Sequence, residues 1–134
     1  YSYLPKTEAS FLKWVVESLK DSKSINVVSD QLNIPTSTNS IADFINRVAL
    51  SEIVGLYHYA DSGIMSRFDF AQLIANVFNL DSDLIKPILT SDLNQTAPRP
   101  LNSGLRTQKI KNELSIYPPD VKESLKSIYD TLTS

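Results

Sequence analysis

The sequence predicts an α/β fold. Segments with apolar residues at helical spacing alternate with short runs rich in β-forming residues, a pattern that is typical of α/β architecture or of a piece of one. The chain has 134 residues, of which 42% are hydrophobic, which is enough for one core. No internal repeat and no low-complexity linker divides it, so we expect a single domain-sized unit over residues 1–134.

The first third of the chain predicts a helix, a strand and a loop. Apolar side chains recur at helical spacing across residues 11–19, and Thr7 is a candidate for the N-cap of this helix. The apolar run Ile25–Val28 follows a polar turn and predicts a strand. Residues 30–39, which Pro35 interrupts, predict a loop.

The middle of the chain predicts two helices around a strand. Residues 41–49 have the helical spacing, and residues 55–60 form a β-rich run after a glycine that predicts a buried strand. Ser66 and Asp69 then form a capping box, with aspartate in the place where glutamate is commoner. The stripe of apolar residues that follows is expected to be buried, and it comprises Phe70, Leu73, Ile74, Val77 and Phe78.

The last third predicts an edge strand, a long loop and two helices. Pro87 within residues 85–89 indicates an edge strand, and residues 91–103 predict an irregular loop. Thr107 is expected to cap a short helix that ends near Glu113. Two prolines and an aspartate at residues 118–120 then start a last helix, whose inward residues would be Val121, Leu125, Ile128 and Leu132.

Composition excludes several classes of function. The net charge of −2 argues against a broad surface for nucleic acid or for an anionic membrane. Without cysteine there is no disulfide, thiolate nucleophile or cysteine-ligated zinc. No apolar run approaches the roughly 20 residues of a membrane span, and the first residues do not resemble a signal peptide. We therefore expect a cytoplasmic protein, and the lack of an initiator methionine predicts a fragment.

Familiar catalytic motifs are absent. Gly55, Gly63 and Gly104 are too far apart to form a phosphate-binding glycine loop, so no dinucleotide fingerprint and no P-loop is present. The single histidine, His58, lies within a predicted strand, where a hydrogen-bonded structural role is commoner than catalysis. The nearby pair Asp81 and Asp83 is typical of a turn rather than of a metal site.

A proline-rich loop carries the first candidate binding residues. Arg99 lies between Pro98 and Pro100, which hold its backbone extended and leave it little conformational freedom. A guanidinium on such a stiff loop suits a bidentate contact with phosphate or carboxylate, and Asn102 and Ser103 add short polar groups beside it. The alternative is a surface arginine in a connector.

A second loop has the same character. Asp30, Gln31, Pro35 and Thr36 lie between a predicted strand and a predicted helix, which is where ligands bind in α/β folds. The segment that follows is also rich in helix-capping residues, so a loop that only caps the helix is an equally good interpretation.

Four motifs in these segments resemble a known family. The chain is similar to the carboxy-terminal part of dTDP-4-dehydrorhamnose reductases, which are extended short-chain dehydrogenases/reductases. The similarity covers nearly all of the chain, and the last motif is the most specific. The four motifs are VVSDQLNIPT at 27–36, GLYHYA at 55–60, SRFDFA at 66–71 and RPLNSGLRTQK at 99–109.

This resemblance implies a fold and a function. The chain would be the carboxy-terminal, substrate-binding portion of an NAD(P)-binding Rossmann-fold enzyme. As an isolated piece it would have an α+β fold. The parent protein would reduce dTDP-4-keto-6-deoxy-L-mannose to dTDP-L-rhamnose with NADPH or NADH. Arg99 would hold the diphosphate of the dTDP-sugar, with Asn102 and Ser103 in support. The resemblance also places Asp30, Gln31, Pro35 and Thr36 at the substrate, and leaves Lys109 open between the pocket and the helix surface.

The chain departs from the family pattern in three features. Asn33 stands where the family usually has glycine, and neither the glycine-rich cofactor loop nor a Tyr-x-x-x-Lys pair is present. We therefore expect the amino-terminal, cofactor-binding half to be absent, and the fragment to bind no cofactor and to be inactive alone. We also expect it to self-associate through an exposed sheet edge or an apolar patch. Two alternatives remain: a non-catalytic protein similar to the regulatory subunit of methionine adenosyltransferase, and a free-standing α+β interaction domain.

Overall fold

The computed structural model describes residues 1–3, 10–49, 51–93 and 97–134. It confirms the predicted α/β class, with a small parallel sheet of two strands, β1 (Ile25–Val28) and β4 (Ile85–Ile88). The register pairs Ile25 with Ile85 and Val27 with Pro87. Pro87 has no N–H to donate, and β1 is its strand's only partner in the described parts of the chain, as predicted for an edge strand.

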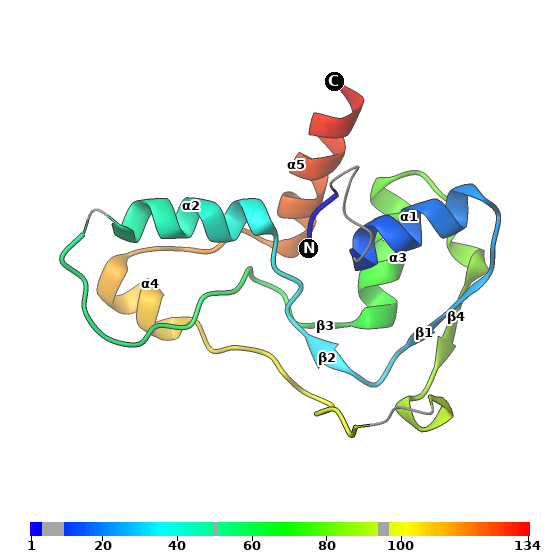
Figure 1. Cartoon of the computed structure of the whole chain (residues 1–134), viewed down its shortest axis with the longest axis horizontal. Coiled ribbons are helices and arrows are strands. Elements are labelled where there is room, and N and C mark those ends of the chain that lie inside the picture. Colours follow the sequence, from blue (N-terminus) through cyan, green and yellow to red (C-terminus); the bar gives the residue numbers. More distant parts are fainter. Residues whose placement is uncertain (4–9, 50, 94–96) are drawn as a thin grey trace.

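The core forms around helix α3 (Arg67–Val77). This helix contacts α1 (Phe11–Lys20), α5 (Val121–Thr133) and both strands of the parallel sheet, and these elements gather on one side of the molecule (Figure 1). Burial of each large aliphatic side chain here contributes about 1.5–3 kcal/mol. The large aliphatic side chains that are fully buried in this cluster are Leu12, Val15, Val16, Ile74, Val121 and Leu125.

The start of α3 follows the sequence prediction. Ser66 Oγ accepts a hydrogen bond from Asp69 N over 3.0 Å, and Asp69 Oδ2 accepts one from Ser66 N over 3.2 Å, which completes the predicted capping box. The predicted apolar stripe is only partly buried: Phe70 and Ile74 are buried, whereas Leu73, Val77 and Phe78 are half-buried.

A second pair of strands, each very short, was not predicted from the sequence. Within the predicted loop of residues 30–39, β2 (Leu32–Asn33) pairs antiparallel with β3 (Met65–Ser66). Leu32 also forms a parallel bridge with Asn102. Strands of two residues are too short to give a period-2 pattern, so the sequence alone cannot reveal them.

The predicted buried strand at residues 55–60 is wrong. The segment has no regular strand structure, and Leu56 is 78% exposed. It lies between α2 (Thr38–Ala49) and α4 (Gln108–Leu114): Tyr59 stacks on Phe44 of α2 at 4.3 Å between ring centroids, and Lys109 Nζ of α4 donates to Leu56 O over 3.0 Å. β-forming residues favour an extended backbone, but a strand also needs a neighbouring strand, and none pairs with this segment in the described residues.

The remaining helix predictions are confirmed with corrections at their ends. Helix α1 has Ser10 as its N-cap, and Thr7 lies outside the described residues. Thr107 is the N-cap of α4, although its side chain makes no capping hydrogen bond. Asp120 caps α5 through a capping box, but Leu132 is 43% exposed, because the last turn of α5 extends beyond the core.

Short turns complete the chain. The 3-10 turns η1 (Ser82–Leu84) and η2 (Thr90–Asp92) flank β4, so the predicted loop of residues 91–103 begins inside η2, and its residues 94–96 lie outside the described ones. Asp81 caps η1 by accepting from Asp83 N over 2.9 Å, as expected for a turn. Among the described helices, none is both long enough and apolar enough to cross a membrane.

Candidate functional site

The two loops that stood out in the sequence meet in the structure. Leu32 N donates to Leu101 O over 2.7 Å, and Ser103 N donates to Leu32 O over 2.9 Å. At the residue just before this strand, Gln31 O accepts a hydrogen bond from Arg67 N over 3.3 Å. The backbone of β2 therefore places the proline-rich loop and the start of α3 beside the Asp30–Thr36 loop.

These contacts surround a cavity of about 340 Å³, which we call the arginine cavity. It contains three of the residues predicted from the sequence, namely Gln31, Arg99 and Ser103. The described residues that line it are Gln31, Leu32, Asn33, Arg67, Arg99, Pro100 and Ser103. No carboxylate in the described part of the chain forms an ion pair with either arginine, so the cavity carries two uncompensated positive charges.

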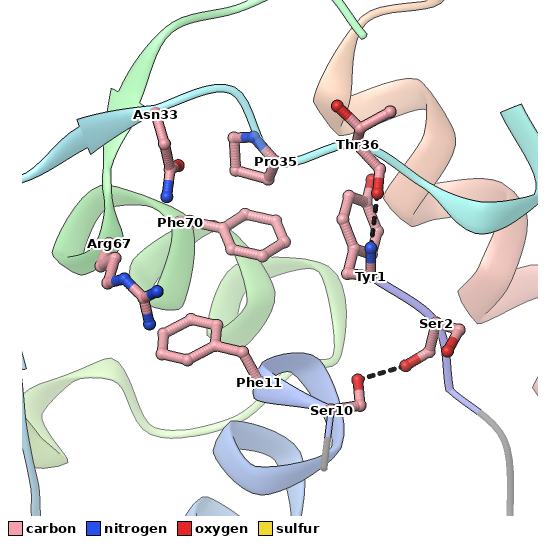
Figure 2. Close-up of a pocket in the computed structure, with 9 residues that line it drawn as sticks. All are labelled: Tyr1, Ser2, Ser10, Phe11, Asn33, Pro35, Thr36, Arg67 and Phe70. Carbon is pink, nitrogen blue, oxygen red and sulfur yellow. Dashed lines mark hydrogen bonds between the residues drawn. The ribbon is translucent and has the colours of Figure 1, made fainter. Parts of the chain in front are cut away.

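Figure 2 shows a second cavity of about 320 Å³, which we call the aromatic cavity. Asn33 and Arg67 line both cavities, and Pro35 and Thr36 bring two further predicted residues to the second. Its apolar wall contains Phe11, which stacks on Phe70 with 5.9 Å between ring centroids. The lining among the described residues is Tyr1, Ser2, Ser10, Phe11, Asn33, Pro35, Thr36, Arg67 and Phe70.

Asn33 fits its position without backbone strain. It is not one of the residues with positive φ, so the structure does not require the glycine that is usual in the resembling family. Its side-chain oxygen Oδ1 is buried and has no hydrogen-bond donor within the described residues. A buried acceptor without a donor costs about 1–3 kcal/mol, so this oxygen is suited to accept a hydrogen bond from a ligand.

Two predicted residues use their side chains in hydrogen bonds that lie away from the cavities. The Asp30 carboxylate accepts from Thr90 N over 3.0 Å and from Thr90 Oγ1 over 2.7 Å, and the bond from the hydroxyl is the main cause that lowers the pKa of Asp30. Asn102 Oδ1 accepts from Gly104 N over 3.0 Å. Neither Asp30 nor Asn102 lines the arginine cavity or the aromatic cavity. Gln31 lines the arginine cavity, and its Nε2 donates to Thr90 Oγ1 over 3.1 Å.

Asp61 is a site-forming residue that the sequence did not reveal. Its carboxylate is only 1% exposed and accepts from Ser37 N over 3.1 Å and from Ser40 Oγ. Its backbone N–H donates to Thr36 Oγ1 over 3.4 Å. Asp61 therefore joins the residues before α2 to the end of the 55–61 segment, and it holds the wall of the aromatic cavity at Thr36.

The residues present do not fit a dinucleotide cofactor. The three glycines lie at separate places: Gly55 beside Lys109, Gly63 beside Asp120 and Gly104 beside Ile64. They therefore cannot together form the glycine-rich turn with which Rossmann folds bind a dinucleotide.

Other candidate residues lie away from the two cavities. Within the described ranges, no three His, Asp or Glu side chains come together as a metal site. His58 is exposed on the 55–60 segment rather than held in a strand. Lys109 lies on the helix surface, 4.2 Å from the Tyr57 ring centroid, and lines neither the arginine cavity nor the aromatic cavity.

Comparison with known proteins identifies similar chains. The family model described as the RmlD substrate binding domain matches residues 2–134. A dTDP-4-dehydrorhamnose reductase of Aggregatibacter actinomycetemcomitans is 31% identical over 130 residues, which are 89% of this chain and 44% of that protein.

Solved structures give the same result. A dTDP-4-dehydrorhamnose reductase of Bacillus anthracis in complex with NADP superposes with a TM-score of 0.87 at 25% identity, covering 94% of this chain and 44% of that one. The ortholog from Clostridium acetobutylicum also has a TM-score of 0.87, at 29% identity, covering 100% of this chain and 47% of that one. The chain thus spans less than half the length of these relatives.

Proposed function

Since the chain belongs to the RmlD substrate binding domain family, we propose that it is the sugar-nucleotide-binding part of a dTDP-4-dehydrorhamnose reductase. The whole protein would reduce dTDP-4-keto-6-deoxy-L-mannose to dTDP-L-rhamnose. A relative solved with NADP supports a nicotinamide dinucleotide as the reductant of the whole protein.

One observation carries this proposal for the chain itself. The hydrogen bonds between β2 and residues 101–103 hold Arg99 at the arginine cavity, next to Gln31 and Ser103. A planar guanidinium binds phosphate oxygens in pairs, and here no protein carboxylate in the described residues competes for it. Gln31 is already bonded to Thr90, so it supports the cavity wall while Arg99 supplies the free donors. Arg99 therefore holds the diphosphate of a dTDP-sugar.

The aromatic cavity is the place for the sugar. It adjoins the arginine cavity at Asn33, so a sugar joined to a diphosphate at Arg99 would extend into it. Phe11 and Pro35 offer apolar surface to the methyl group of a 6-deoxysugar, and Asn33, whose buried Oδ1 has no donor in the described residues, adds a polar side chain to the wall. This combination of apolar walls and few polar groups is typical of small-molecule sites.

Reduction requires groups that this chain does not contain. The glycine-rich loop and the Tyr-x-x-x-Lys pair of the resembling family are absent from residues 1–134, so this part alone binds the sugar nucleotide but does not transfer hydride. In this proposal, the remainder of the whole protein supplies the cofactor site and the proton donor.

Nuclear magnetic resonance of the isotope-labelled chain tests this function. Titration with dTDP should shift the amide signals of Gln31, Arg67 and Ser103, while titration with thymidine, which has no phosphate, should shift them much less. NADPH should not cause the dTDP pattern at matched concentration. Shifts confined to α4, or no shifts with dTDP, would contradict the proposed function.

A further inference from the structure

Arg67 lies at the junction of the two cavities. It is the first residue of α3, and its backbone N–H donates to Gln31 O, which fixes it beside β2. In Figure 2 its guanidinium projects between Asn33 and Phe11, into the space that these residues line. Among the residues that the structure describes, only Asn33 and Arg67 line both the arginine cavity and the aromatic cavity.

No carboxylate of the described residues forms an ion pair with Arg67. The nearest acidic residue of its helix, Asp69, is engaged with Ser66 N and Ser66 Oγ in the capping box. The guanidinium carbon lies 5.6 Å from the centroid of the Phe11 ring, a cation–π contact that orients the side chain but leaves its positive charge in place. A half-buried guanidinium of this kind, without a carboxylate, is suited to an anionic ligand.

We propose that Arg67 is the second cation of a two-arginine diphosphate site. Arg99, on the proline-rich loop, contacts the phosphate nearer the nucleoside, and Arg67 contacts the phosphate nearer the sugar. The assignment follows from position, because Arg99 lines only the arginine cavity, whereas Arg67 also lines the aromatic cavity. This inference rests on the proposed function and adds a residue that determines specificity to the same site.

The consequence is selection by the number of phosphates. Each guanidinium forms two parallel hydrogen bonds with one phosphate, so two guanidiniums match the two phosphates of a diphosphate. A nucleoside monophosphate would contact Arg99 and leave Arg67 without a phosphate partner. Removal of Arg67 should therefore weaken diphosphate binding selectively. A purely structural role, through the contact with Phe11, would change the binding of both ligands alike.

Calorimetric titration of the chain with dTDP and dTMP separates these roles. Arg67→Gln should weaken dTDP binding about tenfold and dTMP binding less than about twofold. Arg99→Gln should weaken both. Arg106→Gln, which removes an exposed arginine that lines neither cavity, is the matched control and should change neither.

The same experiment contains the results that would overturn the inference. If the Arg67→Gln variant lost equal affinity for dTDP and dTMP, or lost no affinity for either, Arg67 would not contact the second phosphate. Arg67→Lys keeps a charge at this position and provides a second variant if the glutamine variant does not fold; it should retain part of the preference for dTDP. Failure of the unsubstituted chain to bind dTDP would reject the proposed function, and the inference with it.

Discussion

Replacement of Asp61 should destabilise the fold by removing a buried hydrogen-bond acceptor. In Asp61→Ala, the N–H of Ser37 and the hydroxyl of Ser40 lose their common partner, and these residues are only 1% and 7% exposed. The Ser40 hydroxyl keeps its hydrogen bond with Tyr59 Oη, so only the Ser37 N–H is left without a partner. A buried polar group without a partner costs about 1–3 kcal/mol, so we expect a loss of about that size in the free energy of unfolding. Asp61→Asn keeps one acceptor oxygen and should lose less.

Urea denaturation at neutral pH measures this loss. Asp43→Ala is a matched control, because Asp43 is an exposed aspartate on α2, and its removal should change the free energy of unfolding by less than about 0.5 kcal/mol. Asp61→Asn keeps the backbone N–H that donates to Thr36 Oγ1 at the aromatic cavity, so it should leave dTDP-sugar binding largely unchanged if it folds. The reasoning would be refuted if the Asp61→Ala and Asp43→Ala variants unfolded at the same urea concentration.

Three further predictions concern pH, capping and association. Asp30 has a lowered pKa in the folded state, so its bonds to Thr90 stabilise the fold above about pH 4 and are lost as the pH falls through the folded pKa. In urea denaturation at pH 7, the Asp30→Asn variant should therefore be less stable than the unsubstituted chain. The difference in stability should disappear in acid. Ser66→Ala removes the N-cap of α3 and should cost about 1 kcal/mol in thermal or urea unfolding, whereas no loss would argue against the capping box. The open edges of the β1–β4 sheet and exposed apolar residues such as Val54 should cause self-association, measured by light scattering; a monomer over a wide range of concentration would contradict this.

Local signals in the sequence were enough to predict most helices. The Ser66 capping box and the helical spacing of the first helix each involve residues within a few positions of one another, and both are confirmed. The strand predicted at residues 55–60 is wrong for a non-local reason, because a strand depends on a partner strand that the local sequence does not contain. Leu132 was predicted to face inward because its spacing continues the stripe, but the core ends before the last turn of α5.

The candidate site was predicted in part. The stiff loop around Arg99 and the loop after β1 were both recognisable from residue types, and the structure brings Gln31, Arg99 and Ser103 to one cavity. Arg67 was overlooked because its motif was interpreted only as a helix start. Asp61 was overlooked because its partners, Ser37 and Ser40, lie more than twenty positions away in the sequence, and nothing local marks such a contact.

The measurement that most directly tests the central claim is a calorimetric comparison of Arg99→Ala and Arg106→Ala. A charged hydrogen bond contributes about 1.5–3 kcal/mol, so loss of Arg99 should weaken the binding of dTDP to the chain roughly ten- to a hundredfold. Arg99→Lys should recover only part of the loss, because an ammonium cannot form the paired contact. Arg106 is exposed and lines neither cavity, so Arg106→Ala should bind as the unsubstituted chain does. Equal affinities of the two alanine variants would mean that Arg99 is a connector residue and that the sugar-nucleotide site lies elsewhere.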